Sequence, residues 1–145
     1  MSGWDHPDPF VQGFRVLPEH IDILEHANNT VYAHWCQDVA WRHSGHLGMP
    51  PSAYLELDRA MALRSAHYEY LLPALLHEEI DAGTWLVASD GRLNMRRHFQ
   101  LRRASDGATL LRGDWELVCI RISTGRPTRM PPEFIACYQP AVIGG

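Results

Sequence analysis

The chain of 145 residues contains no lysine, and its 13 lysine-or-arginine positions are all arginine. Schiff-base catalysis through a lysine amine is therefore excluded, and a bound phosphate would have to meet arginine. Cysteine is also scarce, because Cys36, Cys119 and Cys137 are odd in number and widely spaced. This pattern matches neither a disulfide framework nor a paired zinc knuckle, and it favours a cytoplasmic location.

Long apolar runs are missing as well. No stretch reaches the roughly 18 apolar residues of a membrane span, and the N-terminal segment lacks a basic region followed by an apolar run, so we expect neither a span nor export. A formal net charge of -4 gives no general attraction to nucleic acid. With 46% hydrophobic residues, the chain of 145 residues suits a single domain, 1–145, that needs no disulfide or metal for stability.

Hydrophobic periodicity predicts one dominant helix followed by a sheet. From Thr30 to about Ser44, apolar or aromatic residues recur with the spacing i, i+3, i+4 and i+7, and Gly45 and Gly48 are expected to end this helix. Alternation and turn residues predict strands over 10–17, 59–72, 80–88, 93–103 and 109–122, and short helices over 51–57 and 131–138. The order predicts an α+β fold.

The segment from Asp22 to Tyr32 carries most of the functional information. It reads Asp-Ile-Leu-Glu-His-Ala-Asn-Asn-Thr-Val-Tyr, and it places a carboxylate, an imidazole and two carboxamides just before the predicted helix. Asparagine favours the N-cap position, so Asn28 or Asn29 is a natural start for that helix. A helix N-terminus offers unpaired N–H donors and partial positive charge, which can hold an oxyanion or a polarised carbonyl. This combination suits acyl-transfer chemistry.

The spacing Asp-x-x-x-His-x-Asn-Asn-x-x-Tyr, together with the late segment from Asp106 to Pro131, resembles the hotdog-fold thioesterases of the 4-hydroxybenzoyl-CoA thioesterase and acyl-ACP thioesterase group. The resemblance covers nearly the whole chain. It implies a hotdog fold in which one long central helix is wrapped by a mainly antiparallel sheet of five to six strands. The chain departs from the family pattern at Glu25, where many relatives have glycine, and at His20, where a second acid is usual.

The resemblance implies a thioesterase acting on acyl-CoA, or less readily on acyl-ACP, without a metal or redox cofactor. Asp22 would be the catalytic carboxylate, acting either as the nucleophile or as the general base for water, and the sequence leaves both roles open. The backbone N–H near Asn29 would hold the developing oxyanion, while the His26 and Asn29 side chains would position water or Asp22. A homodimer or homotetramer with active sites at the subunit boundary is expected.

Four residues are predicted to bind the substrate. Asn28 and Tyr32 belong to the motif itself, and Arg96 and Arg97 belong to the main basic concentration of the chain. Arginine binds phosphate bidentately, so this pair is a candidate contact for the phosphates or the pantetheine arm of CoA. The plainer interpretation of the same arginines is a solvated strand face.

Three alternatives to a thioesterase can be distinguished by features of the sequence. A metal site formed by His43 and His46 is disfavoured, because their spacing falls where the helix is predicted to end. A hotdog enoyl-CoA hydratase would carry its aspartate and histidine one residue further apart, with Asn-Pro between them, unlike Asp22 and His26. A non-catalytic acyl-CoA-binding hotdog domain stays open because Glu25 replaces the glycine.

Overall fold

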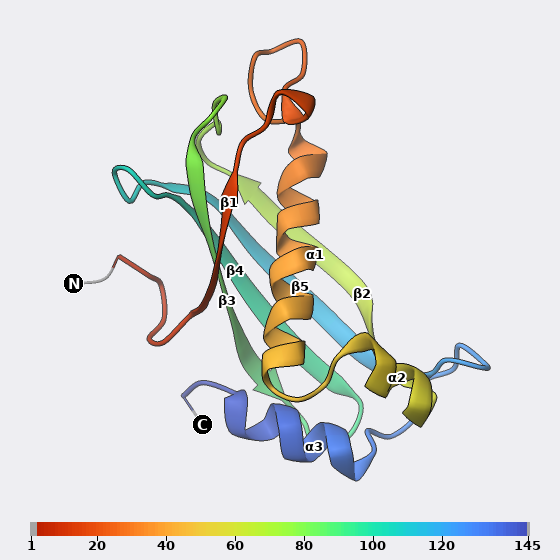
Figure 1. Cartoon of the computed structure of the whole chain (residues 1–145). Helices are drawn as coiled ribbons and strands as arrows, with labels where there is room; N and C mark the ends of the chain where they lie inside the picture. Colours follow the sequence, from red (N-terminus) through yellow and green to blue (C-terminus); the bar gives the residue numbers. More distant parts are fainter. Residues whose placement is uncertain (1–2, 145) are drawn as a thin grey trace. The chain divides into compact units, whose positions relative to one another are not determined.

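The computed structural model describes residues 3–144 (Figure 1). Five strands form one antiparallel sheet in the order β1-β3-β4-β5-β2, which confirms the predicted α+β class. The strands are β1 (Phe10–Arg15), β2 (Arg59–Tyr70), β3 (Glu79–Ser89), β4 (Asn94–Arg103) and β5 (Thr109–Arg121). The helices are α1 (Asn29–His46), α2 (Pro51–Leu57) and α3 (Pro132–Tyr138), and the 3-10 turns are η1 (Pro18–His20) and η2 (Gln139–Ala141). Within residues 3–144, no helix combines the length and apolarity that crossing a membrane requires.

The contacts of the chain divide it into two compact units. Unit 1 comprises Met1–Ala40, Tyr68–Thr84 and Phe99–Gly113, and unit 2 comprises Trp41–His67, Trp85–His98 and Asp114–Gly145. Helix α1 and four of the five strands contribute residues to both units.

Unit 1 contains the first turns of α1 and their partners in the sheet. The Trp35 ring stacks on Phe14 of β1 with 5.8 Å between the ring centroids, and it meets Tyr32 edge-on at 5.7 Å. The apolar face predicted from periodicity is buried, since Tyr32, Trp35, Cys36 and Val39 are at most 4% exposed. Strand β1 pairs antiparallel with β3, from Phe10 opposite Thr84 to Arg15 opposite Glu79. These contacts hold the start of α1 against the sheet.

Unit 2 contains a buried polar cluster at the end of α1. His43, Ser44, Arg97, Tyr54 and Tyr138 are all no more than 8% exposed. The Ser44 hydroxyl donates its proton to the Met49 carbonyl, in the turn after the helix, at 2.7 Å. Because that proton is used, Ser44 accepts a hydrogen bond from the Tyr138 hydroxyl, 2.6 Å away. Tyr138 in turn accepts from Tyr54 at 2.5 Å. This chain of hydroxyls connects α1, α2 and α3.

The end of α1 differs from the sequence prediction. The helix includes Gly45 and continues to His46, because a glycine inside a helix costs only about 1 kcal/mol relative to alanine. Gly48, with φ at +99°, provides the left-handed conformation that follows the helix. The predicted turn at Gly107 is confirmed, since its φ is +73° and the Asp106 carboxylate accepts the N–H of Ala108 at 2.9 Å.

Candidate functional site

The predicted motif forms a closed loop between η1 and α1, drawn in orange in Figure 1. Ile21 and Ala27 form an antiparallel bridge across its base. Inside the loop, the Asp22 N–H donates to the His26 carbonyl at 3.0 Å, and the Glu25 N–H donates to the Asp22 carbonyl at 3.0 Å. The backbone of the loop is therefore fixed by its own hydrogen bonds, and so is the position of Asp22.

The Asp22 carboxylate is half-buried and is held at both oxygens. Its Oδ1 accepts a hydrogen bond from the N–H of Leu24 at 2.9 Å, and its Oδ2 accepts one from Nδ2 of Asn28 at 3.2 Å. The Asn28 Oδ1 in turn accepts both the N–H of Thr30 at 2.9 Å and its hydroxyl at 2.8 Å. Asn28 is therefore the N-cap of α1. Sequence reasoning did not single out Thr30, although a hydroxyl residue just after an asparagine cap is a signal for such a contact.

The first backbone N–H of α1, that of Asn29, has no hydrogen-bond acceptor within residues 3–144. Within residues 3–144, the N–H of Thr30 is bound by the Asn28 side chain and that of Val31 by the Asn28 carbonyl at 2.9 Å, whereas the N–H of Asn29 donates no hydrogen bond. Over the same range, the side chains of His26 and Asn29 make no hydrogen bond. An unpaired donor at a helix N-terminus is suited to an oxyanion. It directly follows Asn28, which contacts Asp22.

Glu25 adopts a backbone conformation that favours glycine. Its φ is +62°, in the left-handed region, where a side chain with a Cβ atom is strained. This is the position at which many relatives of the resembled family carry glycine. The loop therefore retains the turn that glycine would provide, and Glu25 carries the strain.

Replacing Glu25 by glycine is expected to raise the free energy of unfolding by about 0.5–1 kcal/mol. Relief of the left-handed strain, roughly 1–2 kcal/mol, exceeds the extra entropy that glycine gives the unfolded chain. Urea denaturation of both proteins measures the difference. Glu25→Ala is the matched control, since it removes the same carboxylate but keeps Cβ, and a gain as large as that of Glu25→Gly would contradict the interpretation.

Tyr32 ties the start of α1 to the connection between β2 and β3. Its hydroxyl accepts the N–H of Ala74 at 2.9 Å, and the Ala74 carbonyl accepts the N–H of Ala27 at 2.8 Å. The residue is 3% exposed, and burial raises the pKa of its phenol. These two bonds place the β2–β3 connection beside the motif loop.

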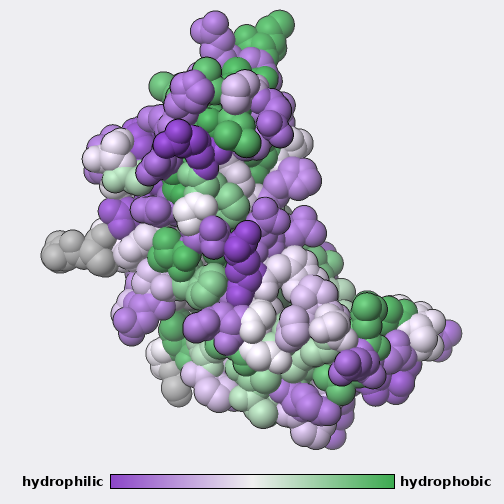
Figure 2. Space-filling view, viewed as in Figure 1, coloured by the Kyte–Doolittle hydropathy of each residue, from purple (hydrophilic) through white to green (hydrophobic). Residues whose placement is uncertain are grey.

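Exposed apolar side chains gather on these two segments. Ile23 and Leu24 in the motif loop are 96% and 69% exposed. Figure 2 shows hydrophobic residues at the tip of this loop, at the top of the view. The β2–β3 connection adds further half-exposed leucines, namely Leu71, Leu72, Leu75 and Leu76. Apolar surface therefore surrounds the segment that presents Asp22.

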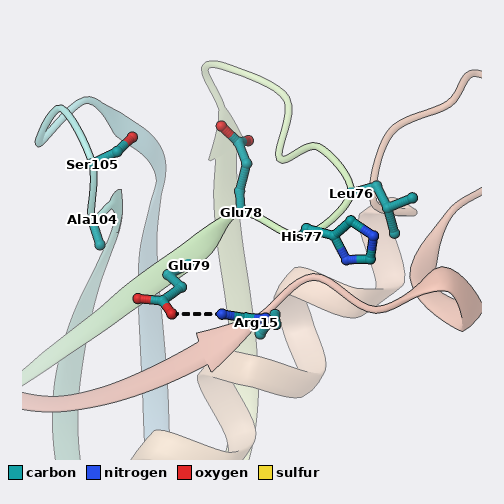
Figure 3. A pocket seen from close by; sticks show the side chains of 7 residues that line it. All are labelled: Arg15, Leu76, His77, Glu78, Glu79, Ala104 and Ser105. Carbon is teal, nitrogen blue, oxygen red and sulfur yellow. Dashed lines mark hydrogen bonds and ion pairs between the residues drawn. The ribbon is translucent and has the colours of Figure 1, made fainter.

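A pocket of about 520 Å³ opens on unit 1 at the end of the β2–β3 connection (Figure 3). Its lining comprises Arg15, Leu76, His77, Glu78, Glu79, Ala104 and Ser105. Arg15 pairs with Glu79 at 2.9 Å, and Glu78 pairs with Arg103 at 2.7 Å. No residue of the motif lines this pocket, and its charged side chains are engaged in ion pairs.

Arg96 and Arg97 differ in their surroundings. Arg96 is exposed and forms an ion pair with Asp114. Arg97 is 3% exposed, and its Nη1 lies 2.8 Å from Nδ1 of His43, so the expectation of a solvated strand face is wrong for this residue. Met95 and Arg97 alternate inward along β4, and this period of two was the available signal. Both arginines belong to unit 2, whereas the motif belongs to unit 1.

The surroundings of the metal-ligating side chains and of Cys36 are also defined in the described part of the chain. Over residues 3–144, no three His, Cys, Asp or Glu side chains gather into a group that could hold a metal ion. Cys36 is buried, and this burial raises the pKa of its thiol, which disfavours a reactive thiolate.

Comparisons with solved structures show the same architecture. A 1,4-dihydroxy-2-naphthoyl-CoA thioesterase from Synechocystis is 14% identical, with a TM-score of 0.79 over 90% of this chain and 96% of that one. A hypothetical protein from Staphylococcus aureus, solved in complex with CoA, is 20% identical, with a TM-score of 0.83 over 93% and 86%. The 12:0-ACP thioesterase from Umbellularia californica is 19% identical, with a TM-score of 0.83 over 94% of this chain and 51% of that one.

Sequence comparison agrees with this structural likeness. None of the curated proteins matches the chain. The model of the thioesterase-like superfamily, however, matches residues 16–137, which include the motif and strands β2 to β5 and begin directly after β1. The chain therefore has the fold of the hotdog thioesterases and belongs to the thioesterase-like superfamily.

Proposed function

We propose that the protein is an acyl-CoA thioesterase, which hydrolyses a thioester to a free acid and the CoA thiol. The observation that carries this proposal is the placement of the Asp22 carboxylate, through Asn28, beside the first turn of a helix whose Asn29 N–H is uncommitted. Membership of the thioesterase-like superfamily supports the reaction class. Structural neighbours that are named as CoA-bound or as acyl thioesterases support a thioester substrate.

The arrangement suggests how the reaction would proceed. The thioester carbonyl oxygen would accept the N–H of Asn29, and the helix N-terminus would stabilise negative charge as it develops on that oxygen. As a general base, Asp22 would take a proton from water while the hydroxide adds to the carbonyl carbon; the tetrahedral intermediate would then break its C–S bond, and the released thiolate would regain a proton from Asp22 or from water. As a nucleophile, Asp22 would instead form an anhydride with release of the thiolate, and water would then hydrolyse the anhydride. His26 and the Asn29 side chain are free to position the water.

The backbone conformation of Glu25 supports a catalytic domain over a non-catalytic one. That alternative depended on a changed turn where relatives have glycine, but Glu25 adopts the left-handed φ of +62° that glycine would provide. Of the four predicted substrate-binding residues, Arg96 is exposed but pairs with Asp114, so a CoA phosphate would have to compete with that carboxylate. The buried surroundings of Tyr32 and Arg97 support roles in holding the fold instead.

A thiol-release assay tests the proposal. We expect the wild-type protein to liberate CoA from at least one ester of a panel that includes acetyl, medium-chain, long-chain and aromatic acyl groups, and we expect Asp22→Asn to abolish that release. The exposed leucines near the motif favour aliphatic chains. Absence of thiol release across the whole panel, with tight binding of the same esters, would favour an acyl-CoA-binding protein.

We also propose that residues 1–145 form one hotdog domain and that the chain assembles as a homodimer or homotetramer. Strand β2 lies at one edge of the sheet, and Leu63 and Tyr70 on it are about half exposed. A long edge strand with exposed apolar residues is a template for pairing with another chain. Sedimentation velocity is expected to give two or four times the chain mass of 16.5 kDa. A monomer at all concentrations would contradict the assembly.

A further inference from the structure

The orientation of the Asn28 carboxamide is set by Thr30. A carboxamide oxygen offers two lone pairs, and Thr30 supplies a donor to each, its N–H at 2.9 Å and its hydroxyl at 2.8 Å. The NH2 group of Asn28 is then directed to the Asp22 carboxylate, where Nδ2 lies 3.2 Å from Oδ2. A flipped amide would set its NH2 group against the Thr30 N–H, which can only donate, and would set its oxygen against the carboxylate.

The Asn28 donor completes a two-point fixation of Asp22. The other oxygen of the carboxylate accepts the N–H of Leu24 at 2.9 Å. With one donor on each oxygen, the plane of the carboxylate is fixed relative to the first turn of α1. Hydrolysis needs a defined line of approach from the carboxylate, or from the water it activates, to the carbonyl carbon, and small misplacements of a reacting group lower the rate strongly.

We propose that Thr30 and Asn28 are positioning residues of the thioesterase site, with Thr30 setting the orientation of the Asp22 carboxylate through Asn28. The inference rests on the proposed function of Asp22. In this inference, Asn28 binds the Asp22 carboxylate and not the substrate. This side chain has two tasks, because the Asn28 oxygen caps the helix while its NH2 group orients the acid.

Variants at position 30 test the role of the hydroxyl. Thr30→Val keeps the shape of the side chain and the backbone N–H but removes the hydroxyl donor, and Thr30→Ser retains that donor. We expect Thr30→Val to lower kcat by about tenfold with little change in KM, and Thr30→Ser to stay within about twofold of the wild type. Equal kcat values for Thr30→Val and the wild type would overturn the role of Thr30.

Asn28→Asp separates capping from positioning. Aspartate caps a helix as well as asparagine does and still accepts from Thr30, but it replaces the NH2 donor by a second negative charge beside Asp22. Repulsion between the two carboxylates should lower the unfolding temperature modestly at neutral pH. At temperatures where the variant stays folded, we expect kcat to fall by at least about 100-fold and the acidic limb of the pH–rate profile to move to higher pH. A fall in kcat that follows only a loss of stability would overturn the positioning role.

A measurement without turnover keeps this inference distinct from the proposed function. The side-chain NH2 signals of Asn28 in a 1H–15N NMR spectrum are expected to shift when Asp22 is replaced by asparagine, and to shift again in Thr30→Val. If these signals respond while the wild type hydrolyses no CoA ester, the proposed function fails and the coupling of the three side chains stands. If they do not respond, the positioning chain is wrong whatever the activity.

Discussion

Replacing Asp22 by asparagine is expected to lower kcat/KM for the best acyl-CoA ester by about 1,000-fold or more, which corresponds to roughly 4 kcal/mol of transition-state stabilisation. The amide can neither add to the thioester as a nucleophile nor take a proton from water, so both possible roles of the carboxylate are lost. Asparagine retains the size of the side chain and an oxygen for the Leu24 N–H, and the loop should therefore keep its shape. The rate of thiol release measures the loss.

Glu19→Gln is a suitable control for this experiment. Glu19 is an exposed acid in η1, three residues before Asp22, and its replacement changes the net charge by the same amount without touching the motif. We expect its kcat/KM to equal that of the wild type, and both variants to unfold near the wild-type temperature. Near-wild-type hydrolysis by Asp22→Asn would refute the proposed mechanism, whichever role the carboxylate has.

Much of the fold follows from local patterns in the sequence. The i, i+3, i+4 and i+7 spacing predicts the buried side of α1 correctly, and the turn residues separate the strands close to their observed ends. Prediction fails where the conformational preference of a residue is weaker than the tertiary contacts around it. Gly45 is a poor helix residue, yet α1 continues through it, because the buried contacts of His43 and Ser44 hold the last turn.

The sequence predicts which residue types form the candidate site, but it does not predict the hydrogen bonds between them. Placing Asn28 before a helix predicts the cap, and the cap brings its amide to Asp22. The left-handed conformation of Glu25 has no signal in the residue itself, because glutamate has no preference for it and the loop imposes it; the glycine that many relatives carry at this position was the available signal. The inward direction of Arg97 has a signal, the alternation along β4, but the cost of burying a charge argues against following it.

The buried pair of His43 and Arg97 should make the stability of the protein sensitive to acid. The guanidinium Nη1 of Arg97 can only donate, so Nδ1 of His43, 2.8 Å away, must accept and the imidazole must be neutral. Burial, the Arg97 cation and the nearby His46 lower the pKa of His43 from 6.5 to about 3. Burial also lowers the pKa of Arg97, to about 10, although the side chain remains a cation at neutral pH. Tyr54 and Tyr138 face the same cluster from α2 and α3.

The sign of the effect follows from proton binding. Below its usual pKa, His43 binds a proton in the unfolded chain, whereas in the folded protein it stays neutral until about pH 3. Above pH 6.5, His43 is neutral in both states and costs the folded protein no stability. As the pH falls from 6.5 towards 3, the folded state loses stability at about 1.4 kcal/mol per pH unit. Between pH 7 and pH 4.5, the folded protein should lose about 2–3 kcal/mol through this residue alone.

His43→Asn is expected to remove this part of the pH dependence, because its Oδ1 can accept from Arg97 in place of Nδ1 but does not titrate. The free energy of unfolding should be measured by urea denaturation at several pH values, and the change with pH should be compared between variant and wild type, which cancels the titration of the carboxylates. His34→Asn is the matched control, since His34 is exposed on the same helix and is not among the groups that lower the pKa of His43. If His43→Asn loses as much stability on acidification as His34→Asn and the wild type, the neutral, buried imidazole is not what makes the folded state sensitive to acid.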